Sequence, residues 1–297
     1  MPAQQRNPST DAALQRTLAA FPTAVLEAPG LVRMPLATPT LPPATTTNHY
    51  LVGNRRTVLV DPSAPARLDQ DRLCELISAF CKLGWQIEAL FLTHHHGDHV
   101  GAAEALSARL GLPVRAHART AELLAGIVTV HQVVEDGAIV AENDDDTTWT
   151  ALHTPGHAAG HLVLRHTAGG MVAGDMVAGE GTILIDPRDG GIADYLGSLQ
   201  RMADAGATWL APAHGPRLVD GQGVLAHYRK HRLAREARIL DALPQAWTAP
   251  DALLPMAYGD VSRLAWPIAL RSVLAHLIHL AGQGLAQSDG TRWRRLR

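Results

Sequence analysis

The stretch Thr93-His94-His95-His96-Gly97-Asp98-His99 directly follows an apolar run at 88–92 that is typical of a buried strand. Loops at the ends of strands bring side chains together on a ligand, and neutral imidazole with carboxylate suits zinc or iron. The first and third histidines, two positions apart in an extended turn, can point at one metal ion. The aspartate and the last histidine can reach a second ion. The stretch therefore predicts a metal site at the end of a strand.

Three further residues of the types that bind metal follow later predicted strands. They are His157 after Thr154-Pro155-Gly156, Asp175 after Ala173-Gly174, and His214 before Gly215. A glycine stands next to each of them and permits an unusual backbone path. A run of histidines on the surface would not be followed by further candidate ligands at strand ends. The chain therefore offers seven candidate metal ligands, namely His94, His96, Asp98, His99, His157, Asp175 and His214.

The order of the predicted elements indicates the fold class. Strands occur first in hairpins and then alternate with helices, twice over, which suits two mixed sheets packed together with helices outside. The pattern predicts an α+β domain over residues 23–220, preceded by a flexible lead-in at 1–22 with at most one short helix. The expected elements are extended chain at 29–47, a hairpin at 50–60, helices at 68–83 and 100–110, strands at 88–93 and 113–116, a hairpin at 162–174, a helix at 192–205 and a strand at 209–212.

The last part of the chain, 221–297, has a different character. A long basic helix at 224–243, a short helix near 250–257 and a third helix at 266–282 precede two short strands joined by Asp289-Gly290. Asp-Gly between such strands is a strong hairpin signal. Three helices and a terminal hairpin predict a small winged-helix domain.

Composition and cysteine spacing bear on the location of the protein. No stretch approaches the roughly 18 uninterrupted apolar residues that span a bilayer, and residues 1–10 lack the features of a signal peptide. Cys74 and Cys81 lie on one predicted helix, too far apart for a disulfide, and are expected to be reduced core thiols. We therefore expect a cytoplasmic protein without a membrane partner.

Charge is distributed unevenly along the chain. Residues 1–225 contain 15 Lys+Arg and 23 Asp+Glu, whereas residues 226–297 contain 11 and 5. A basic segment on an acidic body suggests a separate partner for that segment, and a polyanion such as RNA is one candidate. A winged helix that shapes the pocket or forms a homodimer is the alternative, which we favour because fold alone does not give function.

Residues 25–220 resemble the metallo-β-lactamase superfamily. The resemblance rests on Thr-His-x-His-x-Asp-His at 93–99, Gly-His at 156–157, Gly-Asp at 174–175 and the histidine at 214. It implies an αββα sandwich that binds two divalent ions, most commonly zinc, although the same ligands accept iron or manganese. By this resemblance one ion is held by His94, His96 and His157, the other by Asp98, His99 and His214, and Asp175 bridges the two.

The resemblance also implies roles for residues around the ligands. Asp61 is expected to accept a hydrogen bond from a ligating imidazole and fix its tautomer, and a simple turn residue before Pro62 is the alternative. His161 is expected to pack behind the ligands, and Asp98 to orient the attacking water. An aspartate at 175, where some antibiotic-degrading members carry cysteine, argues against a resistance lactamase. The histidines not expected to bind metal are His49, His95, His117, His131, His153 and His166.

The C-terminal segment, with the residues 227–235 and 272–277, resembles that of lactamase-beta-like protein 2 relatives, from which two functions follow. The metal motif allows a third, against which the winged helix argues. The first is a dinuclear-metal hydrolase that cleaves a small-molecule thioester, ester or lactone. The alternative is a single-stranded RNA endonuclease whose basic segment grips phosphates. A mononuclear-iron persulfide dioxygenase is the remote alternative. The residues that would grip phosphates are Arg229, Lys230, Arg232, Arg235, Arg292, Arg294 and Arg295.

Overall fold

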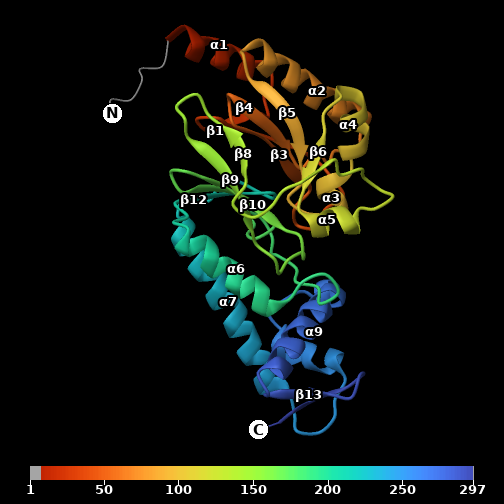
Figure 1. Cartoon of the computed structure of the whole chain (residues 1–297). Coiled ribbons are helices and arrows are strands. Elements are labelled where there is room, and N and C mark those ends of the chain that lie inside the picture. Colours follow the sequence, from red (N-terminus) through yellow and green to blue (C-terminus); the bar gives the residue numbers. More distant parts are fainter. Residues whose placement is uncertain (1–7, 297) are drawn as a thin grey trace. The chain divides into compact units, whose positions relative to one another are not determined.

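The computed structural model describes residues 8–296 and divides by its internal contacts into two compact units (Figure 1). The first unit comprises Met1–His153, Gly160–Gly181 and Thr208–Val219. The second comprises Thr154–Ala159, Thr182–Ala207 and Asp220–Arg297. This division differs from a single boundary at residue 220, because two earlier segments of the chain make most of their contacts with the C-terminal unit.

The lead-in is helical where the structure describes it. Helix α1 covers Pro8–Ala19, and Leu14 and Leu18 pack against the hydrophobic core of the first unit. The predicted flexibility of residues 1–7 lies outside the described part of the chain. Apolar contacts of this kind hold the described part of the lead-in against the core.

The strands of the first unit form one branched sheet whose two arms meet at β4, which pairs antiparallel with β8. Strands β1 to β4 are antiparallel neighbours, and β5, β6 and β7 continue from β4 in parallel. The first arm contains β1 (Val25–Ala28), β2 (Leu31–Ala37), β3 (Thr46–Val52), β4 (Arg56–Val60), β5 (Gln86–Phe91), β6 (Val114–Ala116) and β7 (Gln132–Val133). The second arm contains β8 (Ile139–Glu142), β9 (Thr148–His153), β10 (Leu162–His166), β11 (Gly170–Gly174) and β12 (Trp209–Pro212).

Side chains that alternate between the two faces of the central strands divide the core of this unit into two layers. On β5, Leu90 packs in a cluster with residues of α2 (Arg67–Lys82) and α4 (Ala103–Leu110), whereas Ala89 and Phe91 pack in a cluster shared by both arms of the sheet. Successive side chains of a strand point to opposite faces, so a strand buried on both faces is apolar throughout. The predicted mixed fold with helices outside is confirmed, and the two expected sheets are two arms of one continuous sheet.

The two cysteines correct one detail of the prediction. Cys74 is partly buried on α2, but Cys81 is exposed, so the expectation of two core thiols is wrong for Cys81. The buried face of α2 includes Leu73 and Phe80, each one residue before a cysteine. One residue turns the helix by about 100°, which carries both thiols to the edge of the buried face.

The second unit contains three long helices and a terminal hairpin. Asp220 caps α7 by accepting a hydrogen bond from Gly223 N at 2.9 Å, as acidic residues commonly do at helix starts. Apolar residues of α7, α8, α9 and the hairpin form one core cluster, as a winged helix requires. The elements are α6 (Ile192–Asp204), α7 (Gly221–Ala242), η1 (Pro250–Leu253), α8 (Leu254–Ala257), η2 (Arg263–Ala265), α9 (Trp266–Gly282), β13 (Ala286–Ser288) and β14 (Trp293–Arg295).

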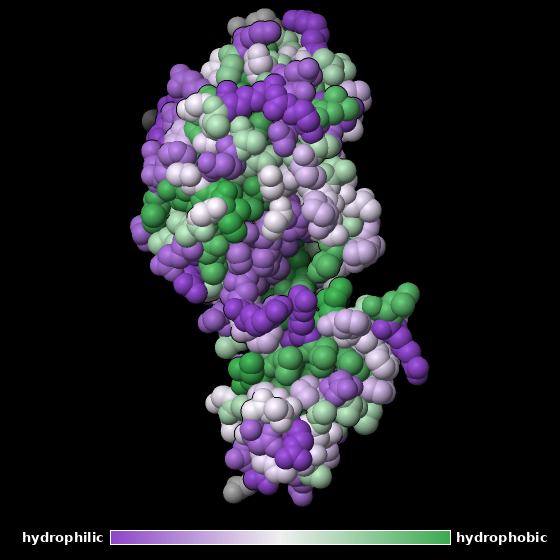
Figure 2. Space-filling model, turned by 90° about the vertical axis from the view of Figure 1, so that its right-hand side faces the viewer, coloured by the Kyte–Doolittle hydropathy of each residue, from purple (hydrophilic) through white to green (hydrophobic). Residues whose placement is uncertain are grey.

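One segment of this unit is unusually apolar. By length and composition, Arg263–Gly282 could cross a membrane, which the count of uninterrupted apolar residues did not reveal. Val273 and Leu277 of this segment are buried in the core of the second unit. Core helices of globular domains pass the same test, so this is weak support for a membrane span. Figure 2 shows further hydrophobic residues on the surface at the height of the C-terminal helices.

Candidate metal centre

The histidine stretch begins just after β5 and ends in a short helix. His94 and His99 are fully buried, and α3 (Gly97–Val100) starts directly after His96. His99 N donates to His96 O at 2.9 Å, and this hydrogen bond closes the turn of α3 that carries Asp98 and His99. In place of one helix predicted at 100–110, the structure has this separate turn, which begins at Gly97, followed by α4 (Ala103–Leu110).

Two imidazoles of the stretch face each other through their ring nitrogens. His94 Nε2 lies 2.9 Å from His96 Nδ1, and His94 Nδ1 lies 3.0 Å from Thr93 Oγ1. Two imidazole nitrogens that meet in this way can direct both lone pairs at one cation. The pair forms one side of a possible ion site.

A second group of ligand atoms surrounds the carboxylate of Asp175. Its Oδ1 lies 3.5 Å from His99 Nε2 and 3.4 Å from His214 Nε2. His214 Nε2 also lies 3.6 Å from Asp98 Oδ2. In two groups, His94 with His99 and Asp175, and Asp98 with His99 and His214, all ligand atoms lie within 4.8 Å of one another.

The geometry of the second group suits a cation better than a hydrogen-bond network. His99 Nε2 is buried and makes no hydrogen bond among the described residues, and Asp175 Oδ1, at 3.5 Å, stands beyond normal hydrogen-bond distance. Buried polar atoms without a hydrogen-bond partner are rare and often mark an absent ion or water. The residues present therefore fit divalent metal ions.

Asp61 fixes the orientation of His99 from the opposite side of the ring. Its Oδ2 accepts from His99 Nδ1 at 2.8 Å and from Thr93 Oγ1 at 2.7 Å, while its Oδ1 accepts from Thr93 N at 2.7 Å. Because Nδ1 donates to Asp61, the lone pair of Nε2 is directed towards the ligand group. Asp61 has a φ of 51°, which suits a turn, but its hydrogen bonds to His99 and Thr93 give it more than the role of a simple turn residue before Pro62.

The electrostatics of the site favour positive charge. Burial acts to lower the pKa of His99, but the carboxylates of Asp175 and Asp61 raise it well above the ordinary value. Burial likewise acts to lower the pKa of His214, and Asp175 again raises it. A pocket that stabilises a proton on buried imidazoles also stabilises a metal cation.

Strand β3 positions His214, although the sequence reasoning did not single out its residues. His214 Nδ1 donates to Thr46 O at 2.9 Å. Asn48 Nδ2 donates to Pro212 O at 2.9 Å and to Gly215 O at 2.8 Å, and Asn48 N donates to Ala213 O at 2.7 Å. Asn48 is buried and thus holds the backbone on both sides of the histidine.

The same strand also holds Asp98 and a second buried histidine. Thr47 Oγ1 donates to Asp98 O at 2.9 Å. His49 Nδ1 donates to Met34 O at 3.2 Å, and its Nε2 accepts from Ser63 N at 3.1 Å. Burial lowers the pKa of His49 to about 4, so this ring is neutral. The available signal was a run of four polar residues, 46–49, at the start of an otherwise apolar strand.

His161 supports the backbone of Asp175. Its ring is fully buried and its Nε2 accepts from Asp175 N at 3.1 Å. A Cβ at Gly174 would lie 2.5 Å from that nitrogen, and Gly174 has a φ of 50°. Only glycine allows the chain to bring the aspartate so close to this imidazole.

His157 belongs to the second compact unit. It is buried, and its Nδ1 donates to Leu184 O at 2.8 Å, which leaves Nε2 as the atom that can bind metal. The preceding Gly156 has a φ of 130°, and a Cβ there would collide with the backbone of Tyr195. Its predicted place beside His94 and His96 stays a prediction.

Comparisons with known proteins agree with this fold. Residues 42–214 match the metallo-beta-lactamase superfamily, and residues 249–293 match the beta-lactamase associated winged helix domain. A beta-lactamase-like protein 2 homolog from Caenorhabditis elegans is 31% identical over 205 residues, which cover 67% of this chain and 66% of the worm protein. The Drosophila melanogaster homolog is 28% identical over 80% of this chain and 83% of its own length.

Other relatives extend the comparison. An atrochrysone carboxyl ACP thioesterase from Aspergillus chevalieri is 30% identical over 67% of this chain, and the match spans 61% of that enzyme. A solved metallo-beta-lactamase family protein from Thermus thermophilus aligns with a TM-score of 0.73 and 23% identity, covering 91% of this chain and all of its own. A beta-lactamase domain protein from Burkholderia ambifaria aligns with a TM-score of 0.77 and 20% identity, covering 92% and 93%. The chain therefore belongs to the metallo-β-lactamase superfamily and is a metal-dependent hydrolase with a β-lactamase-associated winged helix.

Proposed function

We propose that the protein hydrolyses a small-molecule thioester at a centre of two divalent ions, with an ester or lactone as the chemically related substrates. The observation that carries the proposal is that Asp175 lies in one group with His94 and His99, whose ligand atoms are all within 4.8 Å of one another, while its Oδ1 also lies 3.4 Å from His214 Nε2. Because His94 and His99 are proposed ligands of different ions, a carboxylate placed between them could be shared by both. The proposed ligands are His94, His96 and His157 for one ion, Asp98, His99 and His214 for the other, with Asp175 shared.

The choice of a thioester draws support from the relatives. The Aspergillus chevalieri relative is named a carboxyl ACP thioesterase, and its match spans less than two thirds of its own length. Asp175 stands where a lactam-degrading enzyme of the cysteine type would carry sulfur, which favours carboxylate chemistry on other acyl groups. Zinc is the proposed metal, and iron or manganese would suit the same imidazole and carboxylate ligands.

When bound, two divalent ions lower the pKa of a shared water and polarise the carbonyl under attack. We expect Asp98 to orient that water, because its side chain is 18% exposed and Thr47 holds its backbone carbonyl. In the reaction the water oxygen adds to the carbonyl carbon, the carbon–sulfur bond breaks, and the thiol leaves with a proton. Asp98 can hold the proton between these two steps.

RNA cleavage has weaker support from the basic segment than the sequence suggested. Arg232 and Arg235 are buried, and Arg235 Nη1 lies 2.8 Å from Asp260 Oδ1. Arg292 Nη2 likewise lies 2.8 Å from Asp289 Oδ2. Arginines that are buried or paired within the unit have less charge to offer to phosphates.

The test compares the zinc-loaded protein with His96→Ala on an acyl thioester, an aryl ester, a lactone and unstructured RNA. We expect about two metal ions per chain and thioester hydrolysis that falls together with metal content in His96→Ala. His227→Ala, which removes an exposed histidine of α7, serves as the matched control and should retain both.

Two results would contradict the proposal. The first is cleavage of RNA that depends on His96 with no hydrolysis of any of the three acyl substrates. The second is a single iron per chain together with oxygen consumption on a persulfide. Either would assign the site to one of the other chemistries that this superfamily supports.

A further inference from the structure

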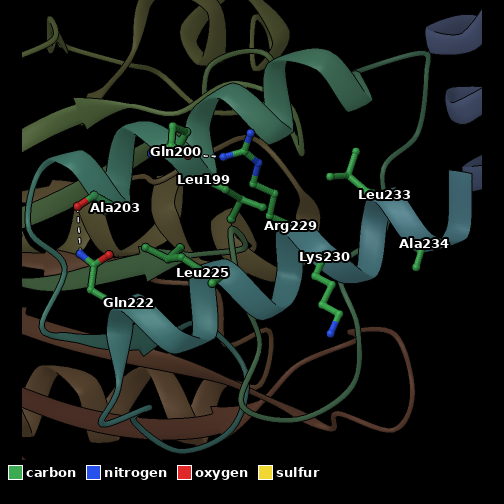
Figure 3. Close-up of a pocket in the computed structure, with 10 residues that line it drawn as sticks. Leu199, Gln200, Ala203, Gln222, Leu225, Arg229, Lys230, Leu233 and Ala234 are labelled. Atoms are coloured by element: carbon green, nitrogen blue, oxygen red, sulfur yellow. Dashed lines mark hydrogen bonds between the residues drawn. The ribbon is translucent and has the colours of Figure 1, made fainter.

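A groove lies between α6 and α7 in the second unit, and none of the residues proposed to bind metal lines it. It has a volume of about 660 Å³ (Figure 3). Figure 3 shows Arg229 reaching from α7 to Gln200 on α6, with Leu199 and Leu225 between the two helices. The lining residues are Leu199, Gln200, Ala203, Gln222, Leu225, Ala226, Arg229, Lys230, Leu233 and Ala234.

Apolar residues of α7 line the groove. Leu225 is buried, Leu233 is 45% exposed, and Ala226 on the same helix is small and exposed. From Gln222 to Ala234, α7 runs for about 18 Å, or roughly three helical turns. Small residues beside exposed leucines along a helix form the kind of groove that receives the apolar face of a partner helix.

The charge of the groove has one sign. Arg229 and Lys230 are its charged residues, and its lining includes no carboxylate. Arg229 donates to the neutral side chain of Gln200, and Lys230 makes no ion pair within residues 8–296. Lys230 extends from α7 on the side away from Gln200, so the two cations flank α7 (Figure 3).

This pattern fits an acidic helix better than a nucleic acid. Single-stranded nucleic acid is bound by a track of cations with aromatic side chains on which bases stack. The lining has two cations and no aromatic residue. An amphipathic helix with apolar residues on one face and carboxylates at its border would match both the leucines and the flanking cations.

We propose that this groove docks an acidic amphipathic helix of a carrier protein that presents the thioester substrate. The inference rests on the proposed thioesterase function, and the name of the Aspergillus chevalieri relative, a carboxyl ACP thioesterase, places a carrier-linked substrate within the family. Docking would raise the local concentration of a thioester that is tethered to its carrier. The same reaction on a small thioester would not depend on the groove.

The experiment measures binding and hydrolysis separately. Fluorescently labelled acyl carrier protein, with its phosphopantetheine arm attached, is titrated with the full chain at low ionic strength. Binding of an unstructured RNA is measured in parallel. We expect Arg229→Glu/Lys230→Glu to weaken carrier binding by about tenfold or more, since two attractive contacts become repulsive. Leu233→Ser should weaken it by several fold, because an exposed apolar contact is lost.

The matched control is Arg16→Glu/Lys82→Glu, which reverses two exposed cations on α1 and α2 of the first unit. It changes net charge equally and should leave carrier binding unchanged. Hydrolysis of a small acyl thioester should stay within twofold in every variant, which shows that each one is folded. With an acylated carrier as substrate, the groove variants should raise KM and leave kcat unchanged.

The outcomes separate docking from catalysis. Carrier binding that depends on the groove, without hydrolysis of any thioester, would support docking and sink the proposed function. Hydrolysis of small thioesters with no carrier binding, or with binding that both reversals weaken alike, would overturn docking and leave the function standing. Loss of RNA binding alone in Arg229→Glu/Lys230→Glu would assign the groove to nucleic acid instead.

Discussion

Each unit of the protein buries a cluster of histidines and carboxylates, and the two clusters differ in how the ring nitrogens are satisfied. In the second unit, Glu236 Oε2 accepts from His276 Nδ1 at 3.1 Å and from His279 Nδ1 at 2.6 Å. In the first unit, Asp175 Oδ1 stands 3.4 to 3.5 Å from the Nε2 atoms of His214 and His99. The Glu236 carboxylate therefore accepts hydrogen bonds from its imidazoles, whereas the Asp175 oxygen stands beyond normal hydrogen-bond distance from His99 and His214.

The surroundings of the second ring nitrogen distinguish a metal-binding histidine from a structural one. A histidine that donates one nitrogen to a backbone carbonyl or carboxylate and directs the other at further ligands is arranged for metal. His99 and His214 follow that rule, because Asp61 and the Thr46 carbonyl take their Nδ1 protons. In the cluster around Glu236, the Nδ1 nitrogens converge on one oxygen within hydrogen-bond distance. His276 Nε2 is also buried without a hydrogen bond, but no group of three metal-ligand atoms forms around it among the described residues, so we interpret that cluster as structural.

The largest effect should come from Asp175→Asn. An amide cannot replace the negative charge that two cations share, so hydrolysis should fall by about three orders of magnitude and metal content should drop. Glu236→Gln removes a carboxylate from the other cluster and should leave both unchanged within twofold. Activity and elemental analysis of the two purified variants check the contrast. Equal loss in both variants would mean that the two clusters do not differ in function.

The next effect concerns stability and pH at His49, a buried histidine of the first unit outside the proposed ligands. Its pKa is lowered to about 4 by burial, from an ordinary value of 6.5. The unfolded chain therefore binds a proton between these values while the folded chain does not, so stability is lost as pH falls from about 6.5 to about 4. The full difference corresponds to about 3 kcal/mol.

His49→Gln should remove that part of the pH dependence. The free energy of unfolding of metal-free protein, measured with urea at several pH values, checks it. The wild type should lose more stability than His49→Gln between pH 6.5 and 4, and equal slopes would show that the histidine is not neutral in the folded state. Because other groups titrate in this window, only the difference between the two proteins is diagnostic.

A smaller effect is expected from Asn48→Ala. The change removes the two side-chain hydrogen bonds that hold the backbone around His214, and mutations behind metal ligands typically lower affinity or activity by about 10- to 100-fold. Asn48→Asp keeps the shape but turns a donor into an acceptor opposite two carbonyl oxygens, so it should be at least as harmful. Metal affinity measured by competition with a chelator distinguishes positioning from a general loss of stability. Normal affinity in both variants would remove Asn48 from the site.

Much of this arrangement could be predicted from the sequence, because ligands at strand ends carry a pattern of residue types. The histidine stretch, Asp175 and His214 each combine a strand end with a neighbouring glycine, and that combination is visible without a structure. The fold class followed from the order of hairpins and helices. The winged helix followed from three helices and an Asp-Gly turn.

The positioning residues could not be predicted in the same way. Asn48 meets Pro212 and Gly215 across more than 160 positions, and such a contact depends on how strands are ordered in the sheet. Polar residues in a strand also have an ordinary interpretation as an exposed face. The exposure of Cys81 was missed for a related reason, since one residue along a helix separates its buried face from its edge.

The smallest effect should come from the cluster of the second unit, in Glu236→Gln. An amide oxygen is a weaker hydrogen-bond acceptor than a carboxylate, so the two hydrogen bonds from His276 and His279 should weaken and the unfolding free energy should fall by about 1 to 2 kcal/mol. Asp241→Asn is the matched control on the same helix, because Asp241 is 77% exposed and stands 3.7 Å from Arg295 Nη1. Exposed ion pairs of that kind contribute about 0 to 1 kcal/mol. Denaturant titration should therefore separate the two variants. Bound metal is measured in the same samples. A loss of bound metal in Glu236→Gln but not in Asp241→Asn would show that Glu236 binds metal and would contradict the structural interpretation of this cluster.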